Sequence, residues 1–192
     1  MILANGAFPR RNGAAWKALA SAARVVCCDG AADAYSRRFR RQPYAVVGDC
    51  DSVRGRYDNI VRIDDQETND LSKAIAYCRA KRLRDPIVLG AVGKCEDHAL
   101  GNIFRALDAG LDVLTDYGLF AYVRGRRSFA VTRGARVSVF ATDRKTRMTS
   151  SGLEWPLREV RFETLYCATL NRATANRVVV VSDKPAYVYI VL

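Results

Sequence analysis

The sequence predicts an α/β N-terminal domain with a parallel, Rossmann-like sheet, followed by a C-terminal antiparallel β-sandwich. Two observations support this prediction. Short apolar runs alternate with helical stretches up to about residue 118, which is the βαβ rhythm of a parallel sheet. Beyond it, strand-like runs follow one another at hairpin spacing with no convincing helix between them. We therefore expect two domains, residues 1–118 and 119–192, and the 49% hydrophobic content can supply their cores.

The first domain is expected to hold short buried strands separated by helices. The strands are apolar runs, mostly β-branched, at residues 2–4, 24–28, 45–47, 60–61, 87–89 and 113–114. The helical stretches lie at about residues 14–23, 31–39, 69–82 and 98–108. In the third of these, Thr68 is a plausible N-cap and Asp70 falls in the first turn, where the helix dipole favours a carboxylate.

The second domain is expected to consist of strands alone, at residues 119–123, 128–132, 135–141, 159–166, 177–182 and 186–192. The basic sequence Arg124-Gly125-Arg126-Arg127 would form a turn between the first two strands. Further along, strand alternation would place Ser151, Leu153 and Trp155 on one face.

Carboxylates gather in one part of the first domain. Seven of the chain's 20 acidic residues lie between Asp49 and Asp70. Asp49 and Asp51 directly follow a buried strand that ends at Gly48, and Asp70 opens a helix. Like charges packed this closely oppose folding unless a cation lies among them, and Mg²⁺ prefers hard oxygen ligands. We therefore predict a Mg²⁺ site at Asp49, Asp51 and Asp70, although helix capping alone could explain Asp70.

A glycine-bearing turn leads into the fourth predicted helix. It begins at Gly90, after a buried strand, and continues through Lys94, Asp97 and His98. Free backbone N–H groups at such a helix start can bind phosphate. A tight turn alone would also explain the glycines, and a cap or core contact would explain His98.

The net charge of +11 raises the question of a nucleic-acid partner. Its best support is two arginine clusters, one at residues 37–41 with Phe39 interleaved and the other at residues 124–127. The first ends a helix and the second is an expected turn, so a solvated basic face is the favoured interpretation. No RNP, KH or helix-turn-helix signature is present, and we expect no nucleic-acid partner.

The chain is also expected to be cytoplasmic, with no membrane partner. No charge-free apolar run approaches the roughly 18 residues of a membrane span, and residues 1–6 do not resemble a signal peptide. The six cysteines show no paired spacing, so neither a disulfide framework nor structural zinc is expected.

Five segments of the chain, taken in order, form a specific combination. Residues 28–32 read Cys-Asp-Gly-Ala-Ala, residues 48–52 read Gly-Asp-Cys-Asp-Ser, and residues 67–74 include Thr-Asn-Asp and Lys-Ala. They are followed by the glycine turn at residues 90–98 and by residues 149–157, which end in Glu-Trp-Pro-Leu. Together these segments resemble motifs of the thiamine pyrophosphokinase family, and the resemblance spans nearly the whole chain.

The resemblance implies a homodimer that uses Mg²⁺ to move the pyrophosphoryl group of ATP to the hydroxyethyl oxygen of thiamine, releasing AMP. Thiamine would lie at an interface, against the β-domain of the partner subunit. By position, the catalytic residues would be Asp49, Asp51, Asp70 and Asp97, of which the first three would hold the metal. The nucleotide-binding residues would be Asp29, Gly30, Ser52, Asn69, Lys73, Gly90 and Lys94. The thiamine-binding residues would be Asp97, His98, Ser151, Trp155 and Asn171.

Departures from the family pattern keep other functions open. Val92 and Cys95 stand where the family usually has Thr and Arg, and Leu170 stands where Ser is common. Lys94, at a position where Gly is typical, would restore the charge of the lost guanidinium. One alternative is a weakened or altered family member acting on another alcohol acceptor. Another is a non-catalytic basic protein that binds an anionic polymer. For Trp155, packing in the sandwich core is the alternative to a thiamine contact.

Overall fold

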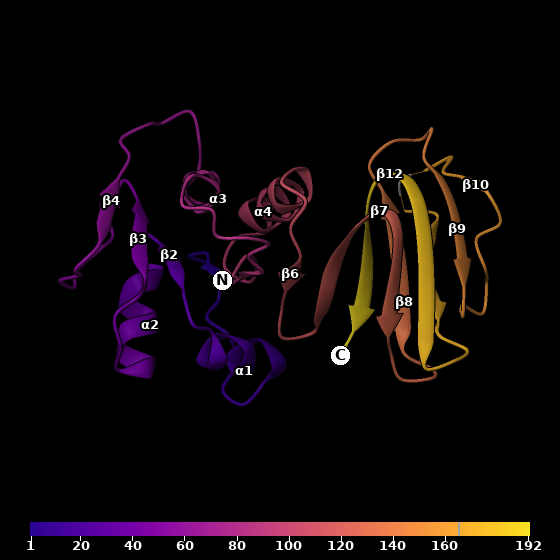
Figure 1. Cartoon of the computed structure of the whole chain (residues 1–192), viewed down its shortest axis with the longest axis horizontal. Coiled ribbons are helices and arrows are strands. Elements are labelled where there is room, and N and C mark those ends of the chain that lie inside the picture. Colours follow the sequence, from indigo (N-terminus) through magenta and orange to yellow (C-terminus); the bar gives the residue numbers. More distant parts are fainter. Residues whose placement is uncertain (165) are drawn as a thin grey trace. The chain divides into compact units, whose positions relative to one another are not determined.

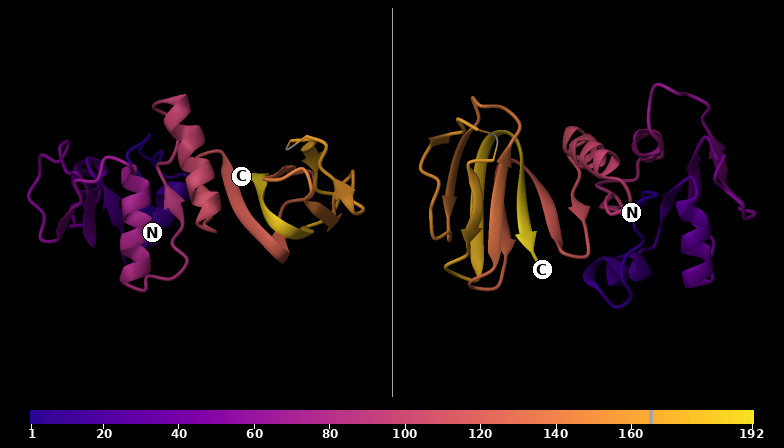
Figure 2. Two further views of the ribbon diagram at one scale, coloured as in Figure 1. Left: turned by 90° about the horizontal axis from the view of Figure 1, so that it is seen from above. Right: turned by 180° about the vertical axis from the view of Figure 1, so that it is seen from behind.

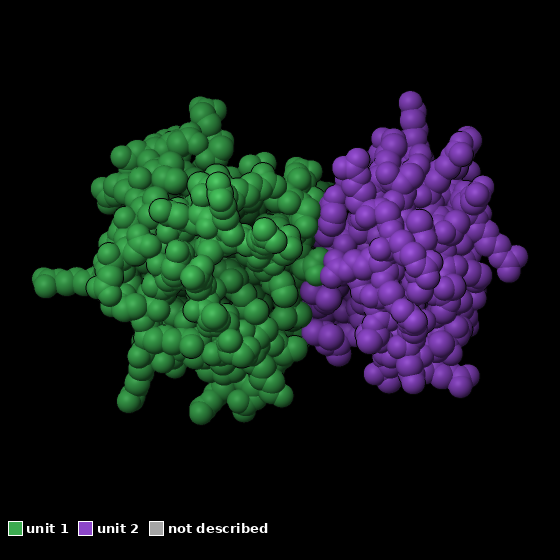
Figure 3. Space-filling model, viewed as in Figure 1, with its two compact units in different colours: residues 1–116 green, residues 117–192 purple. Residues whose placement is uncertain are grey.

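The computed structural model describes residues 1–164 and 166–192. These form two compact units, Met1–Asp116 and Tyr117–Leu192 (Figure 3). The division falls close to residue 118, where the period of the apolar pattern changes. The two units differ in strand pairing, which is parallel in the first and antiparallel in the second.

The N-terminal unit is built on a parallel sheet (Figure 1). Its strands are β1 (Ile2–Leu3), β2 (Val26–Cys28), β3 (Ala45–Gly48), β4 (Ile60–Arg62), β5 (Val88–Leu89) and β6 (Val113–Leu114). Each predicted apolar run of this unit therefore overlaps one of these strands. The spatial order is β6-β5-β1-β2-β3-β4, so the chain reverses its direction across the sheet at β1.

Helices cover both faces of this sheet. They are α1 (Ala14–Ser21), α2 (Ala31–Phe39), α3 (Asp70–Ala80) and α4 (Glu96–Asp108). Leu3, Cys27 and Val46 pack with residues of α1 and α2 in one buried cluster. Because side chains alternate along a strand, the opposite face is left for α3, which contacts β1, β2 and β3. Figure 1 shows α1 and α2 on one side of the strands and α3 on the other.

The C-terminal unit contains β7 (Gly118–Ala130), β8 (Arg136–Ala141), β9 (Arg147–Ser151), β10 (Val160–Arg161), β11 (Ala168–Arg172) and β12 (Arg177–Val191). β7 and β12 pair along their length as the two long strands of Figure 2. β9 pairs with the first half of β12 and β8 with its second half. β10 extends the first group of strands beside β9, and β11 extends the second beside β8. The register of β12 against β7 shifts between Ser182 and Ala186, where the strand on the other side of β12 changes from β9 to β8.

Several expectations for this unit are wrong. The basic sequence at residues 124–127 is not a turn but lies within β7, because Gly125 adopts a φ of 79° and the strand continues through an irregularity opposite the shift in β12. The two strands expected at residues 177–182 and 186–192 are likewise one strand, β12, which ends at Val191. Of the strand expected at residues 159–166, only β10 forms among the described residues, and residue 165 lies outside them. The strand expected around Ser151–Trp155 begins earlier and ends at Ser151, as β9, and β11 was not expected as a strand.

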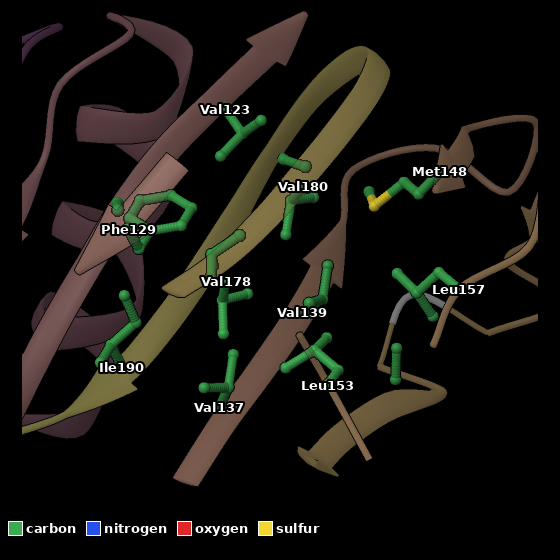
Figure 4. Close-up of a cluster of buried hydrophobic side chains, with 14 of the residues drawn as sticks. Val123, Phe129, Val137, Val139, Met148, Leu153, Leu157, Val178, Val180 and Ile190 are labelled. Carbon is green, nitrogen blue, oxygen red and sulfur yellow. The ribbon is translucent and has the colours of Figure 1, made fainter. Parts of the chain in front are cut away.

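The core of the C-terminal unit collects side chains from both groups of strands (Figure 4). Val139 of β8, Met148 of β9 and Val180 of β12 are fully buried there. Leu153 and Leu157, in the segment after β9, belong to the same cluster. This segment is therefore anchored to the core although it is not itself a strand.

Across residues 1–164 and 166–192, no helix has the length and apolar character needed to cross a membrane. The six cysteines are free thiols, of which Cys95 and Cys167 are exposed and the others buried.

Candidate active site

A cavity of about 720 Å³ opens where the parallel strands of the N-terminal unit end. Its walls come from the loops after β1, β3 and β5 and from the starts of α3 and α4. Because β1 lies between β2 and β5, this is the switch point of the sheet, where open α/β sheets bind ligands. The polar lining residues are Asn5, Asp49, Gln66, Thr68, Asn69, Asp70, Lys73, Lys94, Asp97, His98 and Asn102.

Three carboxylates come together at this edge of the sheet. Asp29 follows β2, Asp49 follows β3, and Asp70 begins α3. One oxygen from each lies within 4.8 Å of the others. Asp29 is buried, and its Oδ1 accepts a hydrogen bond from the backbone N–H of Ser52 at 3.3 Å. Closely spaced carboxylate oxygens are a donor set that fits a hard divalent cation such as Mg²⁺, so these residues could hold one.

Lys73 supplies a positive charge beside Asp70. Its Nζ lies 3.5 Å from Asp70 Oδ1, and its side chain is only 4% exposed. Burial raises the pKa of Asp70, the charge of Lys73 opposes this rise, and repulsion from Asp49 and Asp29 adds to it. The three carboxylates therefore hold more negative charge than this one buried lysine balances, and a bound cation would relieve the excess.

The Asp51 carboxylate is not part of this group, although its backbone N–H donates to Asp49 Oδ1 at 3.3 Å. Its side chain is 82% exposed, and its Oδ1 lies 4.0 Å from the guanidinium of Arg62. Cys50, between Asp49 and Asp51, has a φ of 63°, which turns the chain at the end of the strand. Of the three predicted metal ligands, the structure thus brings together Asp49 and Asp70, and Asp29 joins them.

Gly30, Ser52 and Gly90 shape the surrounding loops and are not part of the cavity wall. A Cβ on Gly30 would lie 3.1 Å from the Cβ of Ser52. Gly90 has a φ of 64°, and a Cβ there would lie 2.6 Å from the carbonyl oxygen of Ala4. The carbonyl of Gly90 accepts a hydrogen bond from the N–H of Gly6 at 2.8 Å. Gly90 and Gly6 thus allow the loops after β1 and β5 to approach each other closely, and Gly30 does the same for the loops after β2 and β3.

The start of α3 is fixed by Asn69. Its Oδ1 accepts hydrogen bonds from the N–H of Ser72 at 2.9 Å and from the Ser72 hydroxyl at 2.7 Å. The expectation that Thr68 caps this helix is wrong, because the Thr68 hydroxyl donates instead to Asp65 Oδ2 at 2.5 Å. The cap orders the first turn, which carries Asp70.

The start of α4 forms another wall. Lys94 Nζ donates to Asn5 Oδ1 at 3.2 Å, which links this wall to the loop after β1. Asp97 and His98 are exposed, and Asp97 Oδ1 accepts the N–H of His98 at 2.8 Å. Cys95 occupies the N-cap position of α4, but its side chain makes no capping hydrogen bond. Because Cys95 carries no charge of its own, the cationic side chain that links this wall to the loop after β1 is that of Lys94.

Sequence reasoning missed some lining residues. Asn5 lies two residues after the end of β1, and that position near a strand end is the signal that could have identified it. Asn102 donates through Nδ2 to the carbonyl of Ala91 at 3.0 Å and so braces the loop after β5. It lies inside α4, where nothing in the sequence marks it. Gln66 lines the cavity from the loop before α3.

The remaining predicted residues belong to the C-terminal unit. Trp155 is 58% exposed, so it is not a core residue. Ser151 is also exposed, but Leu153 is buried. The expectation that these three residues share a face is wrong, because Gly152, with a φ of 80°, follows the end of β9 and breaks the alternation. Asn171 is buried and hydrogen-bonded to the backbone of Trp155.

The first arginine cluster has partners within the chain. The guanidinium of Arg41 donates to the carbonyls of Leu19 and Ala20 at 3.0 and 2.9 Å, at the end of α1. Arg38 lies over the ring of Phe8, 4.3 Å from its centroid. These contacts give the arginines an intramolecular role and favour the interpretation as a structural, solvated face.

Two family models match the chain. The model described as thiamin pyrophosphokinase, catalytic domain, matches residues 15–113, and the model described as thiamin pyrophosphokinase, substrate-binding domain, matches residues 118–189. A curated relative, thiamine pyrophosphokinase 1 from Arabidopsis thaliana, is 28% identical over 225 residues. The match covers 95% of this chain and 82% of the relative.

Solved structures share the fold. Thiamin pyrophosphokinase from Candida albicans superposes with a TM-score of 0.81 at 14% identity, covering 100% of this chain and 89% of that chain. Yeast thiamin pyrophosphokinase gives a TM-score of 0.77 at 13% identity, covering 99% and 84%. Thiamine pyrophosphokinase from Bacillus subtilis gives 0.73 at 14% identity, covering 100% and 98%. At these identities the likeness establishes the fold.

Proposed function

The chain belongs to the thiamin pyrophosphokinase family, whose enzymes make thiamine diphosphate, and we propose that it carries out this synthesis from ATP and thiamine with Mg²⁺. The hydroxyethyl oxygen of thiamine would bond to the β-phosphorus of ATP while the bond from that phosphorus to the α-phosphate oxygen breaks. The alcohol proton is lost and AMP leaves. The observation that carries the proposal is the group of three carboxylates beside a cavity at the switch point of the sheet. We propose that the reaction takes place in the cytoplasm.

For the metal, we propose Asp49 and Asp70 as ligands. Asp29 has an oxygen close to both of them, whereas Asp51 is exposed beside Arg62. This arrangement supports Asp29 as the third carboxylate ligand, in place of Asp51. When bound, Mg²⁺ would neutralise phosphate oxygens as negative charge spreads over them in the transition state. The protein residues would fix where the phosphates lie, which is the main catalytic need of phosphoryl transfer.

For the nucleotide, we propose that the phosphates lie between the starts of α3 and α4. Both helix starts present backbone N–H groups to an anion, and Lys73 and Lys94 add positive charge on the two walls. Lys94 would replace the guanidinium that Cys95 lacks, as a point charge without the planar fork. Asn69 would hold the first turn of α3 in place, while Gly30, Ser52 and Gly90 would shape the loops around the nucleotide.

For thiamine, we propose Asp97 and His98 on the wall formed by α4. Family resemblance adds Ser151 and Trp155 from the other subunit of a homodimer. An exposed indole suits this role, because the face of a tryptophan ring attracts a cationic ring such as thiazolium. In this proposal residues 1–118 form a Rossmann-like catalytic domain. Residues 119–192 form a β-sandwich, with two sheets sharing β7 and β12, that binds thiamine and dimerises.

Incubation with ATP, Mg²⁺ and thiamine, followed by separation of AMP from ADP, tests the proposal. We expect AMP and thiamine diphosphate in equal amounts and neither product when Mg²⁺ is chelated. Asp49→Asn should lose turnover. Asp58→Asn, a change to another acid of the same sequence segment but outside the carboxylate group, should keep it. Formation of ADP, or turnover that ignores Mg²⁺, would contradict the proposal.

Val92 and Cys95 support one second candidate, a family member that transfers the same group to another alcohol. It predicts AMP formation with a different primary alcohol and none with thiamine. A non-catalytic polymer-binding protein would instead show binding that falls steeply with salt and does not need Mg²⁺. The intramolecular contacts of Arg38 and Arg41 disfavour it.

A further inference from the structure

The segment from Gly152 to Leu157 holds an exposed indole between two buried anchors. Leu153 and Leu157 both belong to the core of the C-terminal unit (Figure 4). Trp155, midway between them, is 58% exposed. The backbone of Leu157 is tied further to Ser150, whose hydroxyl accepts its N–H at 2.8 Å. The backbone is thus fixed on both sides of a large aromatic ring that is exposed to solvent. Such an arrangement is typical of a preorganised binding surface.

Asn171 holds the backbone of Trp155 at two points. Its Nδ2 donates to the carbonyl of Trp155 at 2.7 Å, and its Oδ1 accepts the N–H of Trp155 at 3.1 Å. The same oxygen accepts the N–H of Arg172 at 2.8 Å. Asn171 is 3% exposed, and these bonds use three of the four hydrogen-bonding positions of its side chain. The Asn171 side chain therefore makes its hydrogen bonds to the backbone of the protein and not to solvent.

A bulge in β11 directs Asn171 inward. The register of β11 against β8 shifts between Ala168 and Asn171, and Leu170 has a φ of 60° with 74% of its surface exposed. In a regular strand, alternation from the buried Ala168 would bury Leu170 and expose Asn171. The bulge reverses that order. A left-handed conformation is unfavourable for leucine. The burial of Asn171 is therefore accompanied by a conformational free-energy cost at Leu170.

We propose that Asn171 is a positioning residue, which fixes the peptide groups on both sides of Trp155 and so holds the indole ready for a flat cationic ring. The identity of that ring as thiamine's rests on the proposed function. In place of the expected direct contact with thiamine, Asn171 would act through Trp155.

Coupling between substitutions separates the two roles. Asn171→Ala should raise the KM for thiamine roughly three- to tenfold, and Trp155→Ala roughly five- to 150-fold, with the KM for ATP unchanged. If Asn171 acts only through the indole, the double variant should match Trp155→Ala alone. If the two effects multiply, Asn171 contacts thiamine directly and the proposal fails. A rise in the KM for both substrates together with a lower melting temperature would show a general structural role and would also overturn it.

A second readout needs no activity. The other tryptophan, Trp16, packs on Phe39 and is removed by Trp16→Phe, so that Trp155 alone fluoresces. In this background Asn171→Ala should lower the fluorescence anisotropy of Trp155. Asn171→Asp, which keeps the accepting oxygen, should give an intermediate value.

The matched control is Asn176→Ala. Asn176 also accepts a backbone N–H, that of Arg133 at 3.2 Å, in the same unit. Its substitution should leave the anisotropy unchanged. Unchanged anisotropy in folded Asn171→Ala would overturn the proposal, whether or not the protein makes thiamine diphosphate. If Asn171→Ala fails to fold, Asn171→Asp decides the question by the same measurement.

Discussion

At the scale of single residues, the candidate metal site depends on which acids lie together. Asp49 and Asp51 are separated by one residue, yet only Asp49 shares a group with Asp29 and Asp70. Cys50, in a left-handed conformation, turns the chain between them. The geometry therefore ranks Asp29 above Asp51 as a ligand, which is a distinction that can be measured.

Asp29→Asn should weaken Mg²⁺ binding, whereas Asp51→Asn should not. Loss of one of three carboxylates should lower the affinity roughly tenfold, because ligand charge sets much of the attraction for the cation. The Mg²⁺-dependent rise in melting temperature should then shrink for Asp29→Asn and persist for Asp51→Asn. With Mg²⁺ chelated, Asp29→Asn should melt at the same or a higher temperature, since repulsion is relieved. An equal loss of the Mg²⁺ effect in both variants would return Asp51 to the metal shell.

Asp33 ties α2 to the loop that follows the acids. Its carboxylate accepts the N–H groups of Arg54 and Gly55, both at 2.9 Å, and the hydroxyl of Tyr57 at 2.5 Å. Burial, and then this hydrogen bond, raise the pKa of Tyr57 to about 12. The phenol therefore stabilises the folded state in its neutral form.

Tyr57→Phe should lower the free energy of unfolding by about 1 kcal/mol at pH 7, where the hydrogen bond of the partly exposed phenol is intact. A raised pKa means that this contribution is present below the ordinary tyrosine pKa of about 10 and is lost as the pH rises toward about 12. Urea unfolding of both proteins at pH 7, 9 and 11 should show the difference narrowing at the highest pH. A difference that stays constant would mean that the Tyr57 hydroxyl does not carry the effect.

At the scale of elements, local patterns predicted the N-terminal unit better than the C-terminal one. Buried parallel strands read as short apolar runs with helices between them, and each run is visible without knowledge of its neighbours. The antiparallel unit depends on pairing between distant residues. The sequence at residues 124–127 has turn-like composition, but pairing of β7 with β12 carries it through as strand. Gly152 ended an alternation that composition alone would have continued through Trp155.

In the candidate site, too, the residues marked by a local sequence pattern could be predicted, and those that depend on backbone conformation or distant contacts could not. Asp49 could be predicted because it follows a buried parallel strand, whose carboxyl end lies at the ligand-binding edge of the sheet, and Asp70 because it opens the next helix. The choice between Asp29 and Asp51 could not, because it depends on the φ of one intervening residue. The hydrogen bonds of Asn171 could not either, since they join β11 to a loop sixteen positions away in sequence.

Leu170→Asn tests the strain in the bulge of β11. Asparagine adopts the left-handed conformation more readily than leucine, and the exposed leucine side chain contributes little burial. The free energy of unfolding should rise by roughly 0.5–1 kcal/mol, with the KM for thiamine unchanged because Asn171 keeps its bonds. Thr169→Asn, a neighbouring change at a residue outside the left-handed region, is the control and should not stabilise. A destabilised Leu170→Asn protein would show that this leucine makes a contact that outweighs its conformation.

At the scale of the whole molecule, the proposed chemistry is divided between the two units. The carboxylates and the cavity belong to the N-terminal unit, and the exposed indole belongs to the C-terminal unit. The two family models divide the chain in the same way, at residues 15–113 and 118–189. The proposed homodimer joins the acids of one chain to the indole of the other, so a site could be rebuilt from two defective chains.

Mixing Trp155→Ala and Asp49→Asn chains tests this. In a mixed dimer with a shared site, one site carries both changes and the other carries neither, so activity should return. With free subunit exchange and equal amounts, about a quarter of the wild-type rate is expected at a thiamine concentration where Trp155→Ala alone is inactive. The matched control mixes Asp49→Asn with Asp70→Asn, whose carboxylates lie in one group on one chain, so no intact site can form. Recovery in the control, or no recovery in the test pair despite demonstrated exchange, would mean that Trp155 does not complete the partner's site.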